Sequence, residues 1–172
     1  MPKLLKNNCI VDDSRQILAK DYAGDLPEGP CFVPLDYWLA NKSELLGKAD
    51  IGVWLDADQE PESLNDDCTQ LTHIAVNFPT FMDGRGFSIA RLIRERYHFS
   101  GELRAIGQVV PDQLYYLTRC GFDAFCTDAL DLDDELLKQE NLQDAGFEEQ
   151  LNTFSVTYQA CVKQPQPLFQ RR

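Results

Sequence analysis

The chain has 172 residues, 44% of them hydrophobic, which suits a single globular domain with a sizeable core. Its net charge of −12 argues against general nucleic-acid binding, because that binding depends on the neutralisation of phosphates by cationic side chains. No apolar run approaches the roughly 20 residues that span a bilayer, and residues 1–8 contain no apolar core or cleavage site, so we expect a cytoplasmic protein without membrane association.

The first part of the chain has weak periodicity. Residues 1–30 are expected to form an irregular N-terminal segment, with a small hairpin around Asp12-Asp13-Ser14. Pro34 then opens an expected helix, which carries apolar residues as far as Leu46 and ends at Gly47.

Strand and helix patterns alternate regularly through the middle of the chain. Short apolar runs rich in β-branched residues predict the strands, and apolar residues at helical spacing predict the helices. The expected strands are 51–55, 71–78, 103–107 and 122–126, and the expected helices are 60–66, 88–97, 111–120 and 131–139.

Four consecutive strand–helix units predict an α/β fold with a mostly parallel sheet. A doubly wound sheet is the first expectation and a partial β/α barrel is the alternative, since periodicity does not reveal strand order. Alternation at Phe154, Val156 and Tyr158 favours an extended stretch, and residues 160–172 are expected to form an extended tail. No linker interrupts the chain, so residues 1–172 are expected to form one domain.

Charge is distributed unevenly along the chain. Residues 81–120 contain six arginines and four acidic residues, whereas residues 128–149 contain nine acidic residues and one lysine. A locally basic face on an acidic protein suits a small anion, while the overall acidity suits a basic partner. The alternative is that these arginines are solvated or paired with neighbouring carboxylates.

Chemically rich loops follow three of the expected strands. They are Asp56 with Asp58, the turn Asp83-Gly84-Arg85-Gly86, and Gly107-Gln108 ahead of Asp112-Gln113. If the strands are parallel, the loops share the edge of the sheet at which open α/β folds bind ligands.

The turn before the expected helix 88–97 is the main candidate site. Gly84 and Gly86 allow the backbone to approach a ligand, and Arg85 can bind an oxyanion with a forked contact. Alternatively, Asp83 and Arg85 pair with each other and fix the turn, and Ser88 or Asp83 caps the helix. The glycine spacing matches neither a P-loop nor a dinucleotide fingerprint.

Five other polar residues have both a functional and a structural interpretation. Arg104 lies inside an expected strand, where it can pair with Asp83, Glu102 or Asp123 or reach the ligand edge. Asp112 and Gln113 are ligand candidates that also suit the first turn of a helix. Asp56 and Asp58 can face a ligand or form a solvated loop.

Metal and cofactor signatures are absent from the pattern. The six cysteines contain no Cys-x-x-Cys, and the chain has only two histidines, so we expect no zinc or iron–sulfur site. We likewise expect no intrinsic haem or flavin, and the cofactor is unknown.

The sequence of these loops and of the strands before them resembles that of a bacterial domain family of unknown function. This family is labelled as an oxidoreductase involved in sulfite reduction. The resemblance covers roughly residues 30–160. It rests on Trp54-Leu55-Asp56, Phe78-Pro79, Asp83-Gly84-Arg85-Gly86-Phe87-Ser88, Gly101-Glu102-Leu103-Arg104-Ala105, Asp112-Gln113-Leu114 and Arg119-Cys120-Gly121-Phe122-Asp123.

The resemblance implies a role in sulfur assimilation, because members of the family typically lie beside genes for assimilatory sulfite reductase. It brings no established catalytic residues. Our first hypothesis is an auxiliary protein that binds a small anion or a sulfite reductase component. The alternatives are an oxidoreductase with an external flavin or pyridine nucleotide and a scaffolding module without a ligand, so whether the protein is an enzyme stays open.

Overall fold

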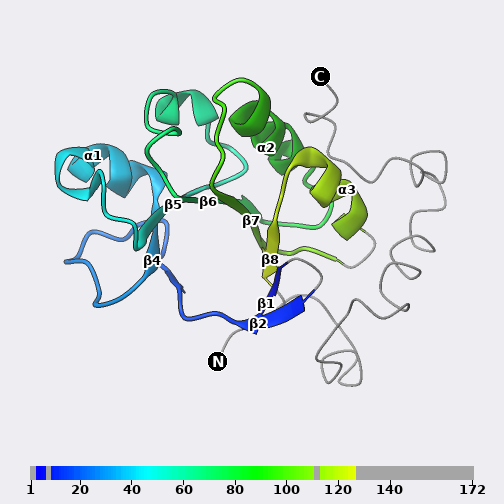
Figure 1. Ribbon diagram of the computed structural model, residues 1–172, viewed down its shortest axis with the longest axis horizontal. Coiled ribbons are helices and arrows are strands. Elements are labelled where there is room, and N and C mark those ends of the chain that lie inside the picture. The colour runs from blue at the N-terminus through cyan, green and yellow to red at the C-terminus, as the bar shows by residue number, and fades with distance from the viewer. Residues whose placement is uncertain (1–2, 7–8, 111–112, 127–172) are drawn as a thin grey trace.

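The computed structural model describes residues 3–6, 9–110 and 113–126 (Figure 1). The expected helix 131–139, the extended stretch around 154–158 and the tail 160–172 lie outside the described residues.

Strands and short helices alternate along the described chain. The strands are β1 (Lys3–Lys6), β2 (Cys9–Asp12), β3 (Gln16–Ile17), β4 (Cys31–Pro34), β5 (Ile51–Leu55), β6 (His73–Phe78), β7 (Glu102–Gly107) and β8 (Ala124–Cys126). The helices are α1 (Leu35–Leu45), the 3₁₀ helix η1 (Pro61–Leu64), α2 (Arg85–Glu95) and α3 (Leu114–Cys120).

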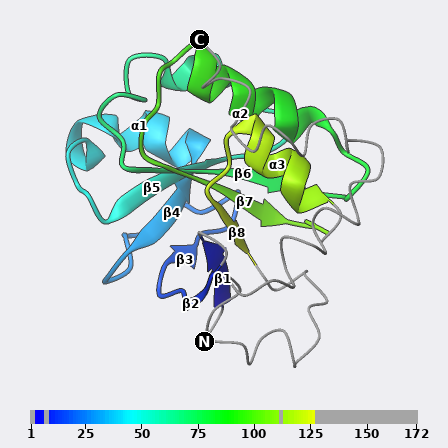
Figure 2. The same cartoon turned by 45° about the vertical axis from the view of Figure 1, so that its right-hand side comes forward.

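These elements form a mixed α/β fold around one curled sheet of eight strands, which makes a half-barrel (Figures 1 and 2). The strand order is β2-β1-β8-β7-β6-β5-β4-β3, and all neighbours from β3 to β8 are parallel. β1 pairs in the antiparallel sense with both β8 and β2, so the sheet is mixed.

The doubly wound arrangement is not confirmed. From β3 to β8, spatial order follows chain order without the reversal that moves helices to the second face of a doubly wound sheet. The three α-helices accordingly lie along the outer side of the curled sheet (Figure 1).

The hairpin expected around Asp12-Asp13-Ser14 does not form. β2 pairs with β1 at one edge of the sheet, whereas β3 pairs with β4 at the opposite edge. The connecting segment instead runs past the concave side of the half-barrel (Figure 1). Local sequence pattern does not reveal this difference, because both arrangements use the same two short strands.

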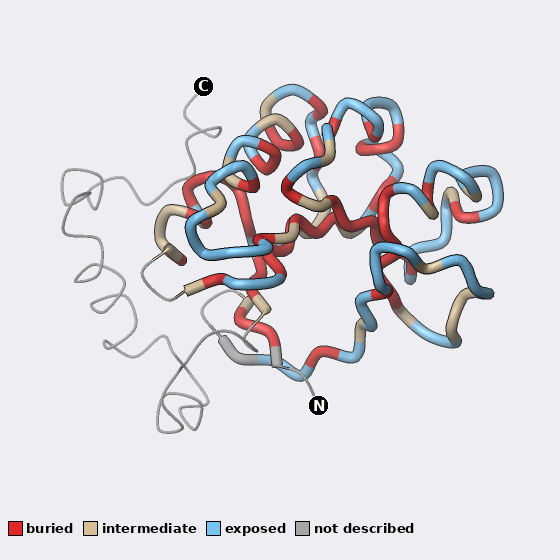
Figure 3. Tube along the Cα trace, turned by 180° about the vertical axis from the view of Figure 1, so that it is seen from behind, coloured by how far each residue is buried: buried red, intermediate tan, exposed pale blue. Residues whose placement is uncertain are grey.

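The sheet is buried on both faces at its centre (Figure 3), which explains why its strands read as continuous apolar runs. On the outer face, Val33, Val53 and Leu103 belong to the main core, which also contains Trp38 and Ile93 of the helices. On the concave face, Phe32, Trp54, Ala75 and Ile106 form a second, smaller cluster. This alternation follows from the two-residue period of a strand.

The N-terminal segment covers part of the concave face. Trp54 Nε1 donates a hydrogen bond of 2.9 Å to the backbone oxygen of Leu18. Asp13 forms an ion pair of 2.6 Å with Arg104 of β7. Residues close to the start of the chain therefore complete the packing of the central strands.

Candidate functional site

The carboxyl ends of β4 to β7 lie at one edge of the sheet because these strands are parallel neighbours. The Asp56 loop follows β5, the Asp83–Ser88 turn follows β6, and Gly107 is the last residue of β7. All three therefore occupy the edge where β/α barrels and open α/β sheets bind their ligands.

Asp56 is the centre of a hydrogen-bonded cluster at this edge. Its carboxylate accepts bonds from Lys20 Nζ at 2.7 Å, from Asn77 Nδ2 at 3.0 Å and from the Ala57 N–H at 2.9 Å. Burial opposes the ionisation of Asp56, but these bonds outweigh burial and lower the pKa of the carboxyl group. Asp56 is therefore a stable carboxylate and a poor proton donor at neutral pH.

Lys20 bridges the two acids of this loop. It lies in the loop between β3 and β4, and its Nζ is also 3.2 Å from Asp58. Hydrogen bonds to Asp56 and then to Asp58 raise the pKa of Lys20. The ammonium group is therefore charged and already occupied by two carboxylates.

Asp83 and Arg85 form a forked ion pair. Arg85 Nε and Nη2 lie 2.9 and 2.6 Å from the two carboxylate oxygens, and the Arg85 N–H donates a further bond to Asp83 at 3.2 Å. The hydrogen bonds from the Arg85 side chain and backbone lower the pKa of Asp83. The pair thus fixes the turn, although the Arg85 side chain remains 59% exposed.

The two glycines of the turn have different roles. A Cβ on Gly86 would lie 2.6 Å from Phe78 Cζ, so glycine allows α2 to approach the end of β6. A Cβ on Gly84 would meet only Phe87 Cδ2 at 3.8 Å, which is an ordinary contact. Gly84 is the N-cap residue without a side-chain cap bond, and Ser88 is exposed within α2.

Arg104 lies on the concave face and not on the carboxyl-end edge. Its side chain is 4% exposed and pairs with Glu102 at 2.9 Å and with Asp13 at 2.6 Å. Glu102 was one of the three partners expected from the pattern. Asp123 instead binds Arg94 and the Leu103 N–H.

Asp112 lies outside the described residues, whereas Gln113 directly precedes α3. Gln113 Nε2 donates a bond of 2.8 Å to the backbone oxygen of Phe81. Gln113 therefore joins the loop after β7 to the loop after β6.

An open groove of about 560 Å³ adjoins this cluster. The loop of residues 20–25 forms one wall and α1 forms the other, with the rings of Tyr22 and Tyr37 5.7 Å apart. Lys20 belongs to both the groove and the Asp56 cluster. Lys20 and Asn77 were not predicted as site residues, because neither lies in a motif. The position of Asn77 near the end of a predicted strand was the only signal in the sequence.

We call the charged surface of this edge and groove the acidic rim. It comprises Lys20, Asp21, Asp25, Asp36, Asp56, Asp58, Asp83 and Arg85. Six of these residues are acidic, and both cations are bound to carboxylates. The surface therefore favours a cationic ligand or partner over a free anion.

Within residues 3–6, 9–110 and 113–126, no group of three or more His, Cys, Asp or Glu side chains is arranged to hold a metal ion. Cys31, Cys68 and Cys120 are buried thiols, and burial raises the pKa of Cys68 to about 11. No helix in this part of the chain has both the length and the apolar character needed to cross a bilayer.

Comparison with known proteins places most of the chain in one family. Residues 52–169 match the model described as "Bacterial protein of unknown function (DUF934)". No curated protein matches the chain. No solved structure matches it either. The matched region includes the Asp56 loop, the Asp83–Arg85 pair and Arg104, so the chain belongs to this bacterial family of unknown function.

Proposed function

We propose that this protein is an auxiliary protein of assimilatory sulfite reduction that binds a sulfite reductase component through the acidic rim. The resemblance described above supports the pathway. Binding through this surface is supported by its charge: the acidic rim has six carboxylates and only two cations, and both cations are already paired.

A protein partner fits this surface better than a small anion. An anion at the Asp83–Ser88 turn would have to displace the Asp83 carboxylate from both nitrogens of the Arg85 fork. A basic protein surface can instead contact the carboxylates while the internal pairs persist. The Asp83–Arg85 pair then serves as a partner contact.

The same charges disfavour a catalytic role with a nucleotide cofactor. The groove beside Tyr22 and Tyr37 has the volume of a small-molecule site. Its lining carries three aspartates and only one lysine, and this net negative charge repels the phosphates of flavin and pyridine nucleotides. Binding is therefore the preferred function over redox turnover.

Neutralisation of groove carboxylates tests the proposal. We expect Asp21→Asn/Asp25→Asn to weaken binding to a purified sulfite reductase component by roughly twofold to thirtyfold, since each of the two exposed charges contributes about 0.2–1 kcal/mol. The loss should lie mainly in the association rate and should shrink at high salt. Surface plasmon resonance at two salt concentrations measures both effects.

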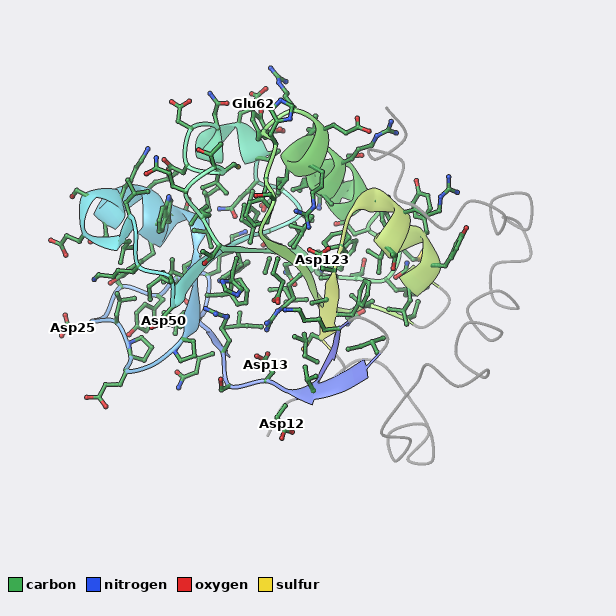
Figure 4. The ribbon with its side chains drawn as sticks, viewed as in Figure 1. Asp12, Asp13, Asp25, Asp50, Glu62 and Asp123 are labelled. Carbon is green, nitrogen blue, oxygen red and sulfur yellow. The ribbon has the colours of Figure 1, made fainter. Side chains whose placement is uncertain are left out.

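Asp50→Asn/Glu62→Gln is the matched control. Asp50 directly precedes β5 and therefore lies at the amino end of this strand, whereas Asp56 lies at its carboxyl end. Glu62 pairs with Arg96 beyond the end of α2 (Figure 4). This variant removes the same number of charges and should bind as the unaltered protein does. Equal losses in the two variants, or no binding by the unaltered protein to any reductase component, would contradict the proposal.

A further inference from the structure

A second charged cluster lies on the concave face, away from the acidic rim. We call it the inner cluster; it comprises Lys6 of β1, Asp13 and Arg15 of the N-terminal segment, His73 of β6, and Glu102 and Arg104 of β7. Figure 4 shows Asp13 on the N-terminal segment at the concave side of the sheet. His73 and Glu102 are the first residues of their strands, so the cluster gathers at the amino ends.

Two of the cations in the inner cluster use both of its carboxylates. Glu102 lies 2.5 Å from Lys6 Nζ and 2.9 Å from Arg104 Nη2. Asp13 lies 2.6 Å from Arg104 Nη1. Arg104 and Lys6 are therefore neutralised by neighbouring charges.

Arg15 has no such partner. Its Nη1 donates to the backbone oxygen of Asp50 at 2.5 Å, and its Nη2 lies 3.3 Å from His73 Nε2. Its guanidinium lies over the Phe32 ring at 5.4 Å, and Arg104 lies over the same ring at 5.0 Å. Among the residues that the structure describes, Arg15 forms no ion pair, although the negative charges of Glu102, Asp13 and Asp50 act on it from a longer distance. The half-buried guanidinium therefore keeps donors that no carboxylate accepts.

The hydrogen bonds around His73 identify its neutral form. Arginine can only donate, so Nε2 accepts from Arg15 and Nδ1 carries the proton. Nδ1 donates to Thr72 Oγ1 at 2.8 Å, and that hydroxyl donates to the Ala49 backbone oxygen at 3.0 Å. His73 is thus held as an acceptor facing a cation.

The surroundings of His73 resist its protonation. Burial and then the positive charge of Arg15 lower the pKa of His73, Arg104 and Lys6 act in the same direction, and Glu102 opposes them. Phe32 faces the ring edge-on, with centroids 6.4 Å apart. A negative charge beside Arg15 would reverse the largest of these electrostatic contributions.

We propose that Arg15 and His73 form a binding site for a small oxyanion of the sulfate, sulfite or phosphate type at the amino ends of β5 and β6. The anion accepts hydrogen bonds from the free guanidinium N–H groups and replaces the direct contact between Arg15 and His73. Protonation of Nε2 then changes His73 from an acceptor into a second donor. Anion binding and proton uptake by His73 are therefore coupled. This site is separate from the acidic rim and does not depend on the proposed partner.

The two histidines of the chain allow a direct test by NMR. The His73 and His98 ring resonances are followed from pH 5 to pH 8 in sodium sulfate and in sodium chloride of equal ionic strength. We expect sulfate to raise the titration midpoint of His73 by about 1 pH unit, which corresponds to about tenfold tighter sulfate binding to the protonated form. The His98 midpoint should not change.

Variants identify the residue responsible. Arg15→Gln should abolish the effect of sulfate on His73, whereas Arg91→Gln, which removes an exposed arginine of α2, should preserve it. Circular dichroism establishes that both variants are folded. An unchanged His73 midpoint in the unaltered protein, equal shifts of both histidines, or a persisting shift in Arg15→Gln would each overturn the proposal.

Discussion

At the scale of single residues, Glu102 links the start of the chain to the middle of the sheet. It lies between Lys6 and Arg104, and Arg104 also binds Asp13. The position of an arginine inside an apolar strand predicts that it is paired, since an unpaired buried charge is costly. Asp13 could not be identified as a partner, because 91 residues separate it from Arg104.

Removal of the Glu102 charge should destabilise the protein, because it leaves a buried cation incompletely paired. We expect Glu102→Gln to lower the free energy of unfolding by about 2–3 kcal/mol at pH 7, because it leaves the buried Arg104 with one carboxylate and Lys6 with none. Urea denaturation measures the change. Glu95→Gln, which breaks the exposed pair with Arg91, is the control and should change stability by less than about 0.5 kcal/mol. Equal effects of the two substitutions would contradict the prediction that burial of the inner cluster increases the contribution of its ion pairs to the free energy of unfolding.

At the scale of elements, the glycine-rich turn allows α2 to pack closely against the end of β6. The pattern of two glycines around an arginine predicts either close approach of a ligand or a fixed turn. The structure provides the second arrangement, since Gly86 faces the Phe78 ring and Arg85 pairs with Asp83. The sequence pattern located this contact between helix and strand. It could not identify which group occupies the space that a side chain at Gly86 would fill.

The two glycines should therefore respond differently to alanine. We expect Gly86→Ala to destabilise the protein by about 1–3 kcal/mol, because its Cβ overlaps the Phe78 ring. Gly84→Ala is the matched control; its Cβ has room and its φ is −81°, so the loss should stay below about 1 kcal/mol. Chemical denaturation of both variants measures the difference. A Gly84 variant as unstable as the Gly86 variant would contradict this role of the helix–strand contact.

At the scale of the whole molecule, the two faces of the curled sheet have different surroundings. Helices cover the outer face, and the N-terminal segment crosses the concave face with its inner cluster (Figures 1 and 2). The acidic rim and the inner cluster lie at opposite ends of the parallel strands. The molecule thus separates an acidic surface from a cluster of mixed charge.

Stability should depend on pH on both sides of neutrality. The lowered pKa of Glu102 and of Asp56 means that the unfolded chain binds more protons in acid, so their stabilisation is present above about pH 4.5 and is lost below it. The lowered pKa of His73 adds a loss as the pH falls below its ordinary value of 6.5.

The alkaline side has the opposite proton balance. The folded Cys68 thiol keeps its proton up to a pKa of about 11, whereas the unfolded thiol ionises from its ordinary value of 9.0, so stability falls above pH 9. Urea titrations from pH 3 to pH 10 should therefore show maximal stability between pH 6.5 and pH 9. A profile that is flat from pH 6.5 down to pH 4 would contradict the assigned pKa directions.

The sequence by itself determined the local elements and the location of the edge loops. Apolar periodicity predicted the central strands and helices because the geometry of each element repeats over a few residues. The sequence also predicted the Asp83–Arg85 pair as one of two arrangements, since only Gly84 separates the partners in the chain.

Only the tertiary structure decided the strand order, the curvature of the sheet and the long-range pairs. Lys20 reaches Asp56 across 36 residues and Asp13 reaches Arg104 across 91. β2 and β3 lie on opposite edges although they are neighbours in the chain. These features depend on which surfaces pack together after the elements form. The apolar period of a single strand or helix specifies which of its faces is buried, but not which other element covers that face.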